Sequence, residues 1–302
     1  QEYSLNLFYM DTYIQIKFDT KKRTNEVKKI KEEVTKIYQD YHELADRYTE
    51  YGHNVYYLIH NTSEEEVITA DPKLYELLSY GETAYQESNG LLDINMGCVI
   101  DKWKYYRELK EGIPTDEELE SCNSVNRLVL LGENQVLNNH PSIDLGAIAK
   151  GYATEKVKEY FESVGITSYI INAGGNVVVG TPQNKDYYQV GIEDPNDGSV
   201  FKVLKVTNQA VVTSGGYERF YEYEGHKYHH IIDPNTNYPS EYMKSVTIIT
   251  DDSALADQLS TTLFLMSIEE GKAYIERYPN VEVIWYSNDD EIIMTEGVKK
   301  YE

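Results

Sequence analysis

Two short segments of this 302-residue chain place polar side chains where phosphate or metal chemistry is possible. Residues 144–152 read Asp-Leu-Gly-Ala-Ile-Ala-Lys-Gly-Tyr, a short strand and glycine turn that lead into a predicted helix. The first N–H groups of a helix lack partners within it, so such a turn commonly binds phosphate. Lys150 would lie in the first helical turn, where the helix dipole disfavours a cation unless an anion is close. An ordinary helix start with a solvated lysine explains this segment about equally well.

The second segment lies in a predicted helix over residues 253–266. Asp257 and Thr261 are four residues apart and therefore share one helical face. Two hard oxygen ligands suit Mg²⁺, which completes its shell with water and substrate phosphates. Neighbouring leucines and Phe264 indicate that part of this face is buried, and a buried carboxylate needs a partner. A solvated Asp/Thr pair remains the commoner meaning of this spacing when it is taken alone.

Two further segments have weaker functional signals. His229 and His230 end a predicted strand just before an Asp-Pro turn. Successive strand residues face opposite ways, so we expect at most one of these histidines to reach a site. A simple aromatic-lined hairpin is the alternative. The paired glycines of residues 172–176 indicate a bulge or a close approach of backbone, which favours an architectural role.

The elements that must position these segments mix strands and helices without regular alternation. The pattern predicts an α+β fold, a single domain over residues 1–302 with two intimate lobes. Strands are predicted at 5–19, 141–144, 168–179 with a break at Ala173-Gly174-Gly175, 187–192, 200–206, 210–213, 217–223, 227–232, 245–250, 281–286 and 291–294. Helices are predicted at 26–48, from Asp71-Pro72, from Thr115 with Glu118, at 147–164, at 253–266 and from Ser267 with Glu270.

The composition limits the possible partners. The chain has 51 acidic and 28 basic residues and a net charge of −23, so nucleic acid and anionic membrane surfaces are poor partners. A phosphate site must therefore bring its own positive charge from a metal, a lysine or helix N-termini. No apolar run is long enough to span a membrane, and we expect the chain as given to be soluble. Cys98 and Cys122 match no metal or redox motif and are either two buried thiols or one incidental disulfide.

Taken in order, these segments resemble the ApbE family of FAD:protein FMN transferases, a family with an α+β fold. The resemblance covers almost the whole chain, and seven segments in register make it specific. They are Met10-Asp11-Thr12, Leu91-Leu92-Asp93 with Gly97 and Trp103, Asp144–Tyr152, Asn172–Asn176, Thr213–Arg219, Tyr228–Thr236 and Ala256–Thr261. One departure is Asn237, which stands where a glycine usually ends the Asp-Pro turn, but asparagine tolerates a positive φ.

The resemblance implies roles for particular residues. The Mg²⁺ ligands would be the carbonyl of Ala147 and the side chains of Asp257 and Thr261, with Ser260 adjacent. His230 would lie near the phosphates, and His230 and Asp257 are both candidates for the general base. Asp144 and Lys150 would contact FAD. The flavin and adenosine pockets would be lined by Met10, Leu91, Leu92, Asp93 and Ile231. Tyr51 is a looser match for a family tyrosine that contacts FAD.

The implied reaction transfers FMN from FAD to a Thr or Ser hydroxyl and releases AMP. The alternatives are a pyrophosphatase that splits FAD into FMN and AMP, and a flavin-binding protein without turnover. The chain has no stretch like the family's acceptor motif, so the acceptor should be a separate protein, of a membrane or cell-surface electron-transfer system. Family members are usually exported and often lipid-anchored, and we expect the same of this protein.

Overall fold

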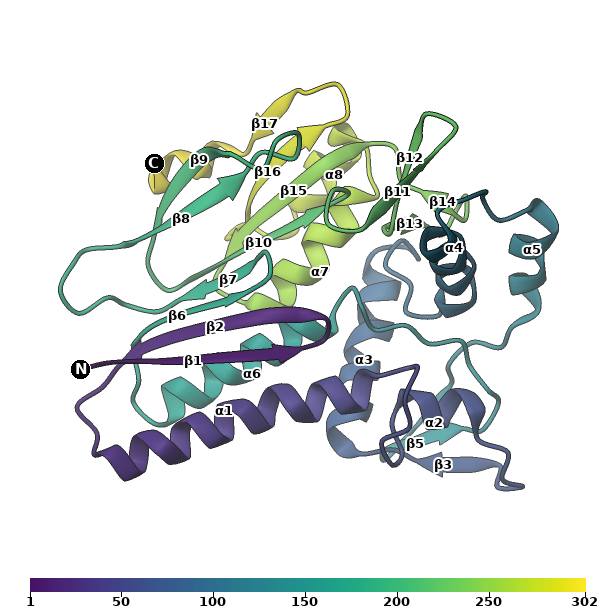
Figure 1. Ribbon diagram of the computed structural model, residues 1–302, viewed down its shortest axis with the longest axis horizontal. Helices are drawn as coiled ribbons and strands as arrows, with labels where there is room; N and C mark the ends of the chain where they lie inside the picture. The colour runs from purple at the N-terminus through teal and green to yellow at the C-terminus, as the bar shows by residue number, and fades with distance from the viewer. The chain divides into compact units, whose positions relative to one another are not determined.

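The computed structural model describes residues 1–302, which divide into two compact units. The first unit consists of residues 1–40, 150–215 and 242–302. The second consists of residues 41–149 and 216–241. Strands and helices are mixed without regular alternation, and the class is α+β, as predicted (Figure 1). The prediction of a single domain over residues 1–302 stays a prediction.

An eight-stranded sheet forms the body of the first unit, in the order β1-β2-β6-β7-β10-β15-β16-β17, with every neighbouring pair antiparallel. A separate hairpin of β8 and β9 packs its apolar residues against this unit's core. The strands are β1 (Glu2–Tyr9), β2 (Thr12–Asp19), β6 (Ser168–Ala173), β7 (Asn176–Val179), β8 (Tyr188–Glu193), β9 (Val200–Val206), β10 (Gln209–Gly215), β15 (Met243–Thr250), β16 (Glu282–Ser287) and β17 (Ile292–Met294).

One predicted strand and one predicted broken strand are in fact hairpins. Residues 5–19 fold as β1 and β2, because Met10 and Asp11 both adopt a positive φ and form a two-residue turn. Residues 168–179 fold as β6 and β7 around Gly174 and Gly175, which also have positive φ. The paired glycines therefore make a tight turn and not a bulge within one strand, which was the wrong part of that prediction.

Helices α1 (Thr24–Ala45) and α6 (Ala149–Ser163) run side by side along the β1, β2 and β6 end of the sheet (Figure 1). The Tyr38 hydroxyl and Thr154 Oγ1 are hydrogen-bonded at 2.9 Å, and the rings of Phe18 and Phe161 lie 5.4 Å apart. Helix α7 (Ser253–Phe264) packs on β10 and β15, and α8 (Ile268–Ile275) follows it. The chain ends in a 3₁₀ helix, Glu296–Tyr301.

The second unit contains four α-helices, a 3₁₀ turn and several short strands. Its helices are α2 (Val55–His60), α3 (Pro72–Glu87), α4 (Gly97–Leu109), α5 (Asp116–Ser121) and a 3₁₀ turn at Cys122–Ser124. Its strands are β3 (Val67–Thr69), β4 (Leu130–Gly132), β5 (Gln135–Leu137), β11 (Phe220–Tyr223), β12 (His226–His229), β13 (Ile232–Asp233) and β14 (Tyr238–Pro239). No helix of the chain has the length and apolar character needed to cross a membrane.

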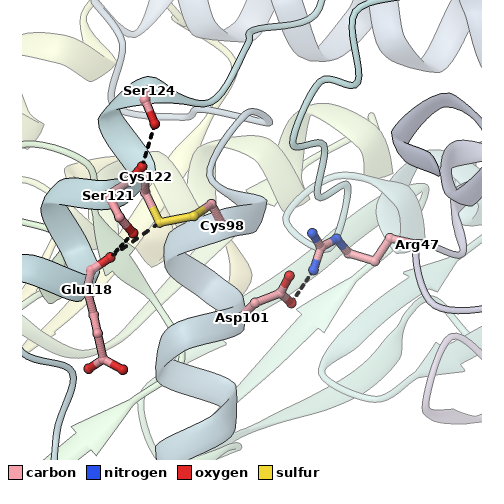
Figure 2. The surroundings of a disulfide bond; sticks show 7 residues. All are labelled: Arg47, Cys98, Asp101, Glu118, Ser121, Cys122 and Ser124. Carbon is pink, nitrogen blue, oxygen red and sulfur yellow. Dashed lines mark hydrogen bonds and ion pairs between the residues drawn. A yellow bond between two sulfur atoms is a disulfide. The ribbon is translucent and has the colours of Figure 1, made fainter. Parts of the chain in front are cut away.

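A disulfide ties the helices of the second unit together. Cys98 in α4 and Cys122 after α5 are bonded, which resolves the choice between two thiols and one disulfide (Figure 2). Nearby, Trp103 donates from Nε1 to the carbonyl of Asn237 at 2.7 Å. Asn237 has φ +60°, so the asparagine at this turn does adopt the left-handed conformation that glycine usually supplies.

The three helix starts with capping signals are confirmed, one predicted strand is absent, and helices α2 and α4 with strands β3, β4 and β5 were not predicted. Asp71 caps α3 with Pro72 at its first position, and both capping boxes, at Thr115 and at Ser267, are present. The predicted strand at 141–144 does not form, and residues 138–144 are irregular backbone. Their groups pair individually instead, as when Asp144 N–H donates to the Ile94 carbonyl at 2.8 Å.

Candidate functional site

The carboxylate of Asp257 is held by the first turn of α6. The N–H of Gly151 donates to Asp257 Oδ2 at 2.7 Å, which gives a helix-terminal amide a charged partner. A side chain at position 151 would not fit, because its Cβ would lie 2.3 Å from Asp257 Cβ and 2.7 Å from the Ser253 carbonyl oxygen. Ser253 in α7 adds a second link, donating from Oγ to the Gly151 carbonyl at 3.0 Å.

Asp257 is buried, with 7% of its surface exposed, as the apolar neighbours predicted. Burial raises the pKa of its carboxyl group, while the charge of Lys150 and the Gly151 hydrogen bond oppose that rise. Only Oδ2 receives a hydrogen bond, which leaves Oδ1 able to bind another donor or a cation. A cation at this point would offset the cost of burying the charge.

Lys150 lies one residue from this contact. Its Nζ donates to the Gly174 carbonyl at 2.9 Å, in the turn between β6 and β7. The cation in the first turn of α6 therefore has two partners within the first unit, this carbonyl and the charge of Asp257. Gly174, one of the two paired glycines, thus helps to position Lys150 through its carbonyl.

Three hydroxyl groups lie beside Asp257. Ser260 has no exposed surface, and its Oγ donates to the Asp257 carbonyl at 2.9 Å. The Ser214 Oγ of β10 lies 2.7 Å from Ser260 Oγ and 3.4 Å from Thr261 Oγ1. Thr261 is partly exposed, so its hydroxyl is the more accessible of the two on α7.

In the second unit, Asp144 organises the turn before α6. Its Oδ1 accepts the N–H of Gly146 at 2.8 Å, and its Oδ2 lies 3.8 Å from Arg47 Nε. Arg47 also donates from Nε to the Ile143 carbonyl at 2.8 Å and pairs with Asp101 through Nη1 (Figure 2). This buried arginine therefore fixes the backbone of residues 143–144.

The sequence did not reveal Arg47. It lies in region 46–61, where the resemblance is weakest, and a lone arginine after a helix is usually a surface residue. Gly97 is the residue that makes room for it, since a Cβ there would lie 2.5 Å from Arg47 Nη2. The one signal in the sequence was therefore Gly97 itself, because a glycine at the start of a helix can indicate that another side chain packs closely against it.

The two histidines of the β12 end differ in what their ring nitrogens do. His229 accepts the Ile231 N–H at Nδ1 and donates from Nε2 to the Ser240 carbonyl at 2.7 Å, so both nitrogens are occupied. Nδ1 of His230 lies 3.2 Å from the Arg219 carbonyl and must carry the proton there, which leaves Nε2 as a free acceptor. Of the two, only His230 has a ring nitrogen without a hydrogen bond, and because β12 ends at His229, strand alternation does not explain this difference. That at most one of them reaches a site stays a prediction.

Both histidines are neutral near pH 7. Burial lowers the pKa of His229 to about 4. Burial, with the charges of His229, Arg219 and Arg107 as further causes, lowers the pKa of His230 to about 3. A neutral His230 can accept a hydrogen bond at Nε2, but with so low a pKa it would be a weak base.

The residues predicted to line the flavin and adenosine pockets differ in their contacts and exposure. Asp93 accepts a bidentate pair from Arg127 at 2.9 and 3.0 Å. Met10 is in the β1–β2 turn, Leu92 and Ile231 are buried, Leu91 is half-buried and Tyr51 is exposed. Ala147 lies in the turn just before α6. The binding roles of all these residues stay predictions.

A family model described as the ApbE family matches residues 10–285, most of the chain. The chain belongs to the ApbE family. A protein of Klebsiella pneumoniae named FAD:protein FMN transferase is 27% identical over 246 residues, covering 78% of this chain and 76% of that one. A protein of the same name from Vibrio cholerae is 30% identical over 223 residues, covering 71% and 65%. The ApbE protein of Thermotoga maritima superposes with a TM-score of 0.88 at 28% identity, over 100% of this chain and 99% of that one.

The first unit of this ApbE chain fits a divalent cation that binds oxygen. Asp257 offers a carboxylate oxygen without a hydrogen bond, and Thr261 offers a partly exposed hydroxyl on the same helical face. No group of three His, Cys, Asp or Glu side chains suited to a metal exists in the chain. A cation here would therefore need further oxygen ligands from a substrate or from water. Mg²⁺ at phosphate sites typically completes its coordination shell in this way.

Proposed function

We propose that this protein transfers FMN from FAD to a Ser or Thr hydroxyl of a separate acceptor protein, with Mg²⁺ required and AMP released. The family, and the name that its relatives carry, support the flavin and the transfer. The observation that carries the proposal for this chain is the Gly151–Asp257 contact, which holds a buried carboxylate beside Lys150 and Thr261. These are the charges and oxygens that a pyrophosphate with a bound cation requires.

In the proposed reaction the acceptor hydroxyl attacks the FMN-side phosphorus of FAD. A new bond forms between that oxygen and phosphorus, the pyrophosphate bond to AMP breaks, and the hydroxyl proton passes to a base. Asp257 and Thr261, with the Ala147 carbonyl, are the proposed ligands of Mg²⁺, and the bound ion would neutralise charge on the phosphates. Ser260 supports this set from within α7, because its hydroxyl already bonds to the Asp257 carbonyl.

The remaining residues would bind and orient the substrate. Lys150 supplies positive charge at a helix start, and Asp144 shapes the turn before that helix. His230 offers Nε2 as the acceptor for the hydroxyl proton, and Asp257 is the alternative base. Because the pKa of His230 is lowered to about 3, it would act best by orienting the hydroxyl rather than by holding its proton.

We also propose that the protein works outside the reducing cytoplasm, on an acceptor of a membrane or cell-surface electron-transfer system. The Cys98–Cys122 disulfide supports this location, since disulfides persist mainly in oxidising compartments.

The test is to incubate the protein with FAD and Mg²⁺, with and without an acceptor domain, and to measure AMP and the acceptor's intact mass. Covalent FMN on a Ser or Thr, with an equal amount of AMP, is the expected result. AMP release at the same rate with and without acceptor, and no change in acceptor mass, would replace the proposal with an FAD pyrophosphatase. FAD binding without any AMP would leave a flavin-binding protein.

A further inference from the structure

We propose that Ser214 is a positioning residue that orients the Thr261 hydroxyl so that its oxygen faces a bound divalent cation. This inference rests on the proposed function, because that function requires the cation. Ser214 is the second-last residue of β10, opposite Val246 of β15, and α7 packs on these two strands. Its Oγ reaches both Ser260 Oγ and Thr261 Oγ1, at 2.7 and 3.4 Å.

The direction of each hydroxyl proton follows from counting donors. A serine or threonine hydroxyl has one proton and two lone pairs. The Ser260 hydroxyl donates its one proton to the Asp257 carbonyl, which can only accept. Ser214 must then donate to Ser260 across the 2.7 Å contact. The contact between Ser214 and Thr261 can be made only if Thr261 donates its proton to Ser214 Oγ.

This direction matters for a cation. A neutral hydroxyl binds a metal through an oxygen lone pair, so its proton must point away from the ion and needs an acceptor there. Ser214 Oγ is that acceptor, and the Asp257 carbonyl is the fixed end of the chain that begins at Thr261. Partners that orient a metal ligand in this way typically change metal affinity by about 10–100-fold when they are removed.

The neighbouring strand position supplies a matched control. Thr213 Oγ1 and Thr247 Oγ1 form a hydrogen bond of 2.8 Å between β10 and β15, and no contact to α7 is involved. Thr213→Val therefore removes one hydroxyl and its hydrogen bond, one residue from Ser214, and leaves the Thr261 hydroxyl unchanged. It reports what losing a strand hydroxyl does to the fold without touching the proposed site.

The experiment measures Mn²⁺ binding to the full chain by electron paramagnetic resonance, with Mg²⁺ as competitor and FAD absent, for wild type, Ser214→Ala, Ser214→Thr and Thr213→Val. Thermal unfolding of each variant in EDTA checks that the variant is folded. We expect Ser214→Ala to weaken Mn²⁺ binding about tenfold. Ser214→Thr, which keeps an acceptor oxygen, and Thr213→Val should both bind Mn²⁺ as wild type does.

Equal Mn²⁺ affinity of wild type and Ser214→Ala would overturn the role of Ser214 while leaving the proposed function in place. Equal weakening by Ser214→Ala and Thr213→Val would also overturn it, because the effect would then belong to the strand and not to the Thr261 proton. Absence of saturable Mn²⁺ binding in the wild type, together with absence of Mg²⁺-dependent transfer, would overturn the proposed function itself. Mn²⁺ binding that depends on Ser214 in a protein without transfer would support the site and reject only the reaction.

Discussion

The N–H of Gly151 donates to Oδ2 of Asp257 at 2.7 Å, although the two residues are 106 positions apart in the chain. This contact brings the start of α6 to the middle of α7. It explains why a glycine stands inside a helix, where it would otherwise weaken the structure. It also makes position 151 a direct probe of the site.

Gly151→Ala should destabilise the protein and impair transfer. Within a helix this change would ordinarily stabilise by roughly 1 kcal/mol, because alanine is the better helix former. Here the new Cβ would lie 2.3 Å from Asp257 Cβ, and overpacking of this kind costs roughly 1–3 kcal/mol. Chemical denaturation and the rate of acceptor labelling measure the two effects.

Gly191→Ala in β8 is the control for Gly151→Ala, since the three atoms nearest to its added Cβ all belong to the exposed Val200 side chain, the nearest at 3.2 Å. A Gly151→Ala protein as stable and as active as wild type would show that the close approach of α6 and α7 is not needed.

Lys150→Ala should weaken FAD binding, by roughly 1–3 kcal/mol for the loss of a charged hydrogen-bonding group. The side chain has only the Gly174 carbonyl as a hydrogen-bond acceptor, so its charge remains available to phosphate. Lys156→Ala, on the same helix but paired at the surface with Glu159, should bind FAD like wild type. Calorimetric titration that gives the same affinity for both variants would contradict the role of Lys150.

The stability of the protein should fall as the pH is lowered from about 6.5 to about 4 because of His229. Its pKa is lowered to about 4 in the folded state, against about 6.5 when unfolded. Between these pH values the unfolded chain binds a proton at this histidine and the folded protein does not. The free energy of unfolding therefore falls by up to about 3 kcal/mol. Urea unfolding across this pH range, for wild type and His229→Gln, measures the contribution.

His226→Gln is the control for the pH series, because His226 is exposed and lies three residues earlier on the same strand. It should keep the wild-type pH dependence, whereas His229→Gln should reduce the slope and leave the part due to His230, whose pKa is lowered to about 3. An unchanged slope in His229→Gln would mean that His229 takes up a proton as readily in the folded protein as in the unfolded chain, which would contradict a lowered pKa.

Removing the disulfide should destabilise the second unit. Cys98 and Cys122 are 24 residues apart, and closing a loop of that length is worth about 3 kcal/mol in the chain-entropy account. A reductant should lower the melting temperature of the wild type and have no effect on the Cys98→Ser/Cys122→Ser double variant. A wild-type melting temperature that is insensitive to reductant would argue that the bond adds nothing to stability.

The sequence predicted the parts of the site that depend on local pattern. The shared face of Asp257 and Thr261 follows from helical periodicity, and the burial of Asp257 follows from its leucine neighbours. The helix starts at Pro72 and after Thr115 follow from capping residues. These signals span a few residues each and need no knowledge of the rest of the chain.

The parts that the sequence could not predict depend on contacts between distant segments. Nothing near Ser214 indicates that it meets α7, and nothing near Arg47 indicates that it holds the Ile143 carbonyl, 96 residues away. Residues 141–144 have a strand-like composition but find no neighbouring strand. The turn at Met10 was missed because residues 5–19 alternate as one long strand would, and the predicted break at Gly174 was not identified as the turn of a hairpin.

The most direct test of the central claim compares wild type with Asp257→Ala in one assay, with FAD, an acceptor domain, and either Mg²⁺ or EDTA. The account predicts that wild type with Mg²⁺ attaches one FMN to a Ser or Thr of the acceptor for each AMP released. EDTA should stop the reaction, renewed Mg²⁺ should restore it, and folded Asp257→Ala should be inactive even at saturating Mg²⁺. Full acceptor labelling by Asp257→Ala, or by wild type in EDTA, would contradict the account.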